Sequence, residues 1–202
     1  KVKNLERLIE QQPLSGQCGI SHTRWATHGV PSKENAHPHV CHNEIALVHN
    51  GIIENHEMLR QQQLNAGHEF DSQTDTEVIV HAVYDHWKQS ADLLDAVQQT
   101  IKILEGAYAL GVVETANNKR LIAARKGSPL VIGINDGEYF IASDVFALLG
   151  EASQFIYLED GDVADISLDS LVIYDQTGQV VTRAINETEL KADNIGLGRY
   201  KH

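Results

Sequence analysis

The chain has 202 residues, 42% of them hydrophobic, a size that suits one domain with a real core better than two domains. Its formal net charge of −12 argues against nucleic acids and anionic membranes as main partners, because both attract Lys and Arg. No apolar run approaches the roughly 18–20 residues that span a bilayer, and the two cysteines form no Cys-x-x-Cys motif, which favours a reducing cytoplasm.

The first third of the chain predicts two helices, two short strands and one long loop. Residues 1–12 carry apolar side chains at helical spacing and are followed by Pro13. Residues 18–22 and 44–49 have the pattern of strands. The polar, proline-containing stretch 24–43 between them is predicted to be a loop, and a loop this long in a compact domain is usually functional. Residues 54–66 predict a helix closed by Gly67.

The pattern changes from helical to alternating at Ala107. Before that point, Thr74 and Glu77 have capping-box spacing at the start of a helix that runs through Trp87, and a second helix covers residues 90–104. Beyond it, strands are predicted at 108–114, 120–125, 130–135, 138–142, 155–158, 162–167, 171–174 and 180–185, with one or two helical turns at 145–149. Helices between two groups of strands favour an α+β domain with an antiparallel sheet.

Histidine is concentrated in one part of the chain, where seven of the eleven lie between His22 and His56. These histidines could either bind a zinc ion or be hydrogen-bonded residues of loops and of the core. The spacings His22/His28, His37/His39/His42 and His49/His56 form no standard closed ligand pattern, and no His-Glu-x-x-His motif occurs. The sequence therefore predicts no metal site.

Three polar positions could contact a small ligand. Arg24 follows a predicted strand, and its planar guanidinium suits a carboxylate. Asp75 lies in the first turn of a predicted helix, where a helix-dipole role is the alternative. Together the two charges suit the ends of a free α-amino acid. Asn50 and Gly51 follow a strand and could donate an amide and a backbone N–H to an oxyanion, or could form an ordinary Asn-Gly hairpin turn.

Cys18 and Cys41 are expected to be small buried side chains and not nucleophiles.

Several longer strings of residues carry a family resemblance. In chain order they are His22–Gly29 (HTRWATHG), Asn35–His39 (NAHPH), Val48–Asn55 (VHNGIIEN), Thr74–Glu77 (TDTE) and Gly127–Leu130 (GSPL). They resemble the glutaminase domain of the glutamine–fructose-6-phosphate aminotransferases, over nearly the whole chain to about Ile185. The resemblance implies the four-layer αββα sandwich of the N-terminal-nucleophile hydrolases, here truncated at its N-terminus.

The resemblance also implies roles for individual residues. Arg24 is expected to bind the α-carboxylate of L-glutamine and Asp75 its α-amino group, with Thr27 and His28 in the same pocket. The oxyanion hole is expected from Asn50 and Gly51, and a gate for ammonia from Trp25. No cofactor is implied. The ammonia would convert fructose 6-phosphate to glucosamine 6-phosphate in a second domain.

The chain departs from the family pattern at both ends. The family's nucleophile is an N-terminal cysteine upstream of the point where Lys1 aligns, and neither Cys18 nor Cys41 matches it. The sequence is therefore interpreted as an internal fragment, inactive by itself. Residues 1–186 form a partial glutaminase domain and residues 187–202 begin a linker to a sugar-isomerase domain, through which a homodimer is expected. A non-catalytic amino-acid-binding module on the same fold is the alternative from another functional class, and a metal-binding protein is a third.

Overall fold

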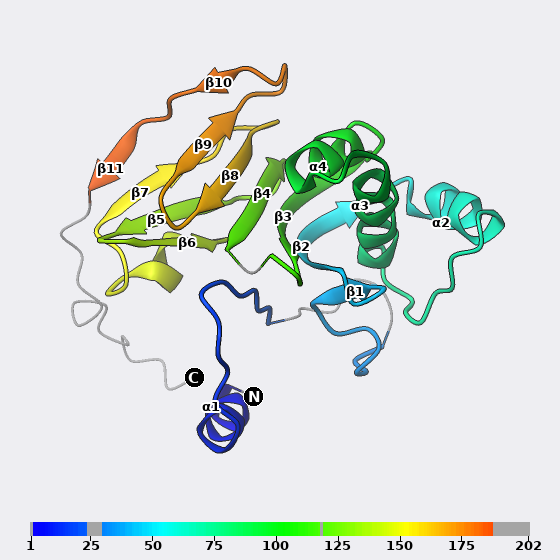
Figure 1. The fold of residues 1–202 in the computed structure, drawn as a ribbon, viewed down its shortest axis with the longest axis horizontal. Helices are drawn as coiled ribbons and strands as arrows, with labels where there is room; N and C mark the ends of the chain where they lie inside the picture. Colours follow the sequence, from blue (N-terminus) through cyan, green and yellow to red (C-terminus); the bar gives the residue numbers. More distant parts are fainter. Residues whose placement is uncertain (1, 24–29, 118, 188–202) are drawn as a thin grey trace, which may run out of the picture.

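The computed structural model describes residues 2–23, 30–117 and 119–187. Its helices are α1 (Val2–Gln11), α2 (His56–Asn65), α3 (Thr76–Ser90), α4 (Leu93–Ile101) and the short 3-10 helix η1 (Val145–Leu148). Helix α1 stands apart from the sheets, whereas α3 and α4 lie together over the larger sheet (Figure 1). Within the described part of the chain, every helix is too short or too polar to cross a lipid bilayer.

Two antiparallel sheets form the centre of the molecule (Figure 1). The larger sheet has the order β1-β2-β3-β4-β8-β9-β10 and the smaller one the order β11-β7-β5-β6. Their strands are β1 (His39–Cys41), β2 (Ile45–Ile53), β3 (Gly106–Glu114), β4 (Arg120–Lys126), β5 (Val131–Asn135), β6 (Glu138–Ala142), β7 (Gln154–Tyr157), β8 (Val163–Ser167), β9 (Leu171–Tyr174), β10 (Val180–Val181) and β11 (Ile185–Glu187).

Alternation along the strands produces two apolar layers. Ile122 of β4 is fully buried against the helices, in a cluster that also holds Val78 and Val97. The neighbouring Ala123 points to the opposite face, where it packs between the sheets with Ile132 and others. Among the described residues, η1 covers the far face of the smaller sheet. The predicted α+β sandwich is confirmed, because the sheets pack face to face with helices outside them.

The predicted loop 24–43 contains the short strand β1 at its end, and two predicted strands, 18–22 and 180–185, differ from the structure in kind. Residues 18–22 are not a strand. They form no backbone ladder with a neighbouring strand. Ile20 instead packs its side chain against the apolar cluster between the two sheets. The stretch 180–185 is two strands, because the chain leaves the larger sheet after β10 and joins the smaller one at β11. At this crossing Arg183 makes two hydrogen bonds of 2.7 and 2.8 Å to the fully buried carboxylate of Asp162.

Candidate functional site

The Asn50-Gly51 pair lies inside β2 and not in a turn. Asn50 pairs with Ala109 of β3 and Gly51 with Tyr108, so the hairpin-turn interpretation is wrong. Gly51 has φ of +134°, and a Cβ added there would lie 2.0 Å from the carbonyl oxygen of Ala107. This position therefore accepts only glycine, whose lack of a side chain lets the two strands approach. Strand β2 also runs four residues past the predicted end at His49.

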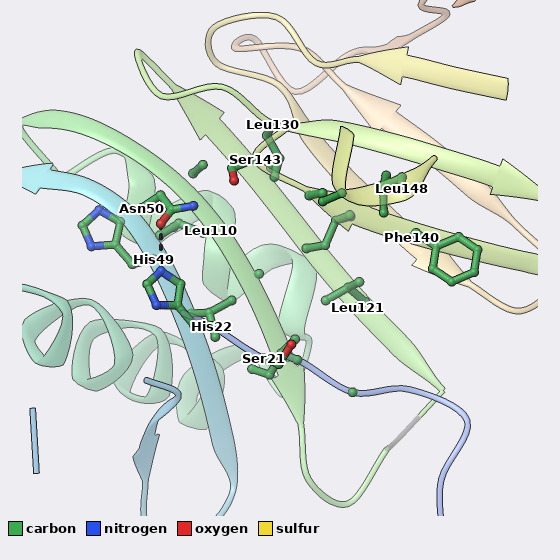
Figure 2. Close-up of a pocket in the computed structure, with 18 of the residues that line it drawn as sticks. Ser21, His22, His49, Asn50, Leu110, Leu121, Leu130, Phe140, Ser143 and Leu148 are labelled. Atoms are coloured by element: carbon green, nitrogen blue, oxygen red, sulfur yellow. Dashed lines mark hydrogen bonds between the residues drawn. The ribbon is translucent and has the colours of Figure 1, made fainter. Parts of the chain in front are cut away.

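The Asn50 side chain faces a cavity between the two sheets. The cavity has a volume of about 480 Å³ and is lined by β2, β3, β6 and the extended residues 19–23. His22 Nε2 lies 2.8 Å from Asn50 Oδ1. Figure 2 shows the amide oxygen turned toward His22 and the amide nitrogen on the other side. The contact to His22 thus fixes the amide while its two N–H groups stay available as donors.

Asp75 connects the start of α3 to the end of β2. Its side chain is only 3% exposed and makes no capping bond to its own helix. Its Oδ2 instead accepts a hydrogen bond of 2.9 Å from the backbone N–H of Ile53. A buried carboxylate is costly unless charged or polar partners surround it. The Ile53 N–H is one such partner, and it fixes Asp75 at the end of the strand that carries Asn50 and Gly51.

The loop before Asp75 is held by Glu77 in a way that the capping-box spacing did not predict. The Glu77 carboxylate accepts hydrogen bonds from the backbone N–H groups of Asp71 and Ser72 and from Ser72 Oγ. Burial alone would raise the pKa of Glu77, but the neighbouring His81 side chain and the hydrogen bonds from Ser72 and these backbone groups lower it to about 2. Glu77 is therefore ionised at neutral pH and fixes the loop that positions Asp75.

Histidines and threonines form a hydrogen-bonded network beside Asp75. Thr76 Oγ1 lies 3.0 Å from both His37 Nε2 and His49 Nδ1, and Thr74 Oγ1 lies 3.0 Å from His39 Nε2. The rings of His37 and His22 have centroids 4.3 Å apart, so the network reaches the Asn50 amide. For these four histidines, hydrogen-bonded loop and core positions are confirmed.

We expect His49 to make the fold sensitive to mild acid. Burial lowers the pKa of His49 below its ordinary 6.5, although the charge of Asp75 opposes this. The unfolded chain then binds a proton near pH 6.5 that the folded chain does not, so stability falls below that pH, by up to about 1.4 kcal/mol per pH unit. Urea unfolding at about pH 7.5 and about pH 5.5 should show a smaller loss for His49→Gln than for the native protein. Equal losses would contradict this assignment.

The structure brings together part of the predicted site. Asn50, Gly51 and Asp75 meet around the C-terminal half of β2. Arg24, Trp25, Thr27 and His28 lie outside the described residues. Sequence reasoning did not assign His22, His49 or Thr76 to the site. His22 lies in the same sequence motif as Arg24, and Thr76 in the same motif as Asp75. This shared position in a motif could have assigned them to the site.

Comparisons with known proteins agree with this geometry. A family model described as a glutamine amidotransferase domain matches residues 22–150. Two solved structures share the fold. One is the glutamine phosphoribosylpyrophosphate amidotransferase from B. subtilis, with a TM-score of 0.65 and 28% identity over 79% of this chain and 35% of that one. The other is described as the allosteric regulatory enzyme of purine biosynthesis, with a TM-score of 0.63 and 30% identity over 76% of this chain and 34% of that one.

The chain therefore belongs to the glutamine amidotransferase domain family. Over its whole length it is 53% identical to a protein of Idiomarina loihiensis, 50% identical to one of Pseudomonas putida and 48% identical to one of Legionella pneumophila. Each of these relatives is named glutamine–fructose-6-phosphate aminotransferase (isomerizing). The chain spans 33% of their length and corresponds to their glutaminase region.

Proposed function

We propose that this domain hydrolyses the side-chain amide of L-glutamine and that the ammonia converts fructose 6-phosphate to glucosamine 6-phosphate, with release of glutamate. The observation that carries the proposal is the buried carboxylate of Asp75, anchored to β2 three residues beyond Asn50. Strand residues rise by about 3.3 Å, so Asn50 and Ile53 are roughly 10 Å apart. This is the scale of an extended amino acid with a hydrogen bond at each end.

Each end of glutamine has a partner in the proposal. Asp75 binds the α-ammonium group, and Arg24 binds the α-carboxylate as a bidentate fork. The Asn50 amide and the Gly51 backbone N–H donate to the oxygen that becomes negative when the amide is attacked. Thr27 and His28 complete the pocket, and Trp25 gates the passage of ammonia. The relatives' shared name supports these assignments, as do the strings that hold the residues.

The proposal assigns the attacking thiolate to neither cysteine of the sequence. Burial raises the pKa of Cys18, and burial with nearby Asp85, Glu44 and Glu77 raises the pKa of Cys41 to about 12. Both are therefore protonated thiols at neutral pH and poor nucleophiles. Cys41 is buried in the core beside the helices, and Cys18 is half-buried against the core between the sheets.

The wider organisation is part of the same proposal. Residues 1–186 act as the glutaminase domain, and residues 187–202 lead to a sugar-isomerase region through which two copies associate. The threefold greater length of the relatives supports this division. A cytoplasmic location is supported by Cys18 and Cys41, which form no disulfide in the described structure.

The test is a product assay on the intact native protein with L-glutamine and fructose 6-phosphate. We expect glutamate and glucosamine 6-phosphate in equal amounts. Glutamate without the amino sugar would restrict the function to glutamine hydrolysis. Binding of glutamine without glutamate release would replace the proposal with a non-catalytic amino-acid-binding module.

A further inference from the structure

A second cluster of polar side chains lies where the start of the larger sheet, the segment before α3 and α3 itself meet. It joins Cys41 at the end of β1, His68 in the segment between α2 and α3, and His81 in the middle of α3. Each residue offers one ligand atom, and the three atoms lie within 4.8 Å of one another. Figure 1 shows β1 and the segment after α2 beside α3, so three distant parts of the chain meet here.

We propose that Cys41, His68 and His81 bind one divalent transition-metal ion of the zinc type. Thiolate and imidazole are the ligands that zinc prefers, whereas Mg²⁺ and Ca²⁺ prefer oxygen. Cys41 Sγ lies 3.3 Å from His81 Nδ1. A tetrahedral ion with Zn–S of about 2.3 Å and Zn–N of about 2.0 Å places these two atoms about 3.5 Å apart, close to the observed distance. The three ligand atoms together, within 4.8 Å of one another, would move closer when the ion binds.

The groups around the cluster also fit a cation. His81 turns Nδ1 toward Cys41, and its Nε2 lies 3.7 Å from the Glu77 carboxylate. His68 Nε2 lies 2.9 Å from both carboxylate oxygens of Asp85. Each histidine is thus paired with a carboxylate, and such carboxylates hold metal-ligating imidazoles in place.

Burial and charge favour an ion that remains bound. Cys41 is 2% exposed and His81 is 7% exposed, so little water competes for them. Metal binding would release the proton of the Cys41 thiol, and the thiolate formed, together with the Asp85 carboxylate, would balance the charge of a divalent ion. Water supplies the fourth ligand at zinc sites with three protein ligands.

An ion at this position would join β1 to α3 next to the glutamine site. β1 begins at His39, which contacts Thr74, and α3 begins one residue after Asp75. The ion would therefore fix two elements that shape the Asp75 end of the site without contacting the substrate. Its role would be to hold these two elements together.

Cobalt substitution in the intact native protein tests the proposal. The metal-free protein is titrated with Co²⁺, which shows thiolate-to-cobalt charge transfer in the near ultraviolet and visible bands typical of a tetrahedral ion. We expect the charge-transfer band and the visible bands to reach their maximum at one Co²⁺ per chain, and to disappear when Zn²⁺ displaces the cobalt. Cys41→Ser should remove the charge-transfer band, and His81→Gln should weaken binding by at least about 10-fold. Asp85→Asn should weaken it by about 10–100-fold.

Matched controls are Cys18→Ser, which removes the other thiol of the printed sequence, and His86→Gln, which removes an imidazole from the same helix. Both should leave the cobalt spectrum unchanged. The absence of a thiolate band in the native protein would overturn the proposal, and so would a band lost equally in Cys18→Ser. A native spectrum without a thiolate band overturns the proposal even if a variant at Cys41 or His81 fails to fold.

Discussion

Replacing Asn50 with aspartate should lower kcat for glutamine hydrolysis by about 10²–10³-fold while KM changes little. An ionised aspartate has the shape of asparagine but donates no hydrogen bond, so the developing oxyanion would lose one donor and face a negative charge. Because His22 Nε2 lies 2.8 Å from Asn50 Oδ1, the new carboxylate keeps this contact and the fold should be retained. Steady-state kinetics of glutamate release by the intact native protein measure the effect.

The control for this substitution is Asn65→Asp, which makes the same chemical change on the exposed surface of α2. It should leave kcat unchanged. A normal kcat for Asn50→Asp would remove Asn50 from the oxyanion hole. An increase in KM at normal kcat would make it a substrate-binding residue instead.

Replacing Asp75 with asparagine should lower kcat/KM for glutamine by at least about 30-fold, because neutralising one partner of a buried charge pair costs roughly 2 kcal/mol or more. Asparagine keeps an oxygen that can accept the bond from Ile53 N–H, so the link between α3 and β2 survives. The loss should therefore come from the missing attraction to the α-ammonium group.

A substrate without the amino group isolates this attraction. The native protein should hydrolyse glutamine far better than 4-carbamoylbutanoate, and Asp75→Asn should narrow that preference. Asp136→Asn, in the exposed turn between β5 and β6, is the matched control and should keep the preference. An unchanged preference in Asp75→Asn would assign Asp75 to structure alone.

Much of the fold was predictable from the sequence because its strands alternate clearly and its helices have apolar stripes. The Asp136-Gly137 signal correctly indicated the β5–β6 hairpin. The failures occurred where pairing partners decide the structure. Residues 18–22 alternate like a strand but lack ladder pairing, and the stretch 180–185 changes sheets in its middle. The Asn50-Gly51 pair resembles a turn, yet pairing with β3 keeps it extended.

The sequence motifs predicted which residues belong to the candidate site, but they did not predict how those residues contact one another in three dimensions. The strings identified Asn50, Gly51 and Asp75, whereas the bond from Ile53 to Asp75 depends on how α3 packs against β2. The Cys41, His68 and His81 cluster had no sequence signal, because its members come from β1, a loop and a helix. Only the three-dimensional packing places such residues together.

The pairing of β2 with β3 also bears on the order in which the chain assembles. β3 and β4 are joined by a short connection and can pair early, whereas α2, α3 and α4 all intervene between β2 and β3. Contacts between distant parts of a chain form at a greater cost in entropy and usually form later. The pairing that holds Asn50 and Gly51 in place is therefore expected to form after the pairing of β3 with β4, late in the folding of the chain.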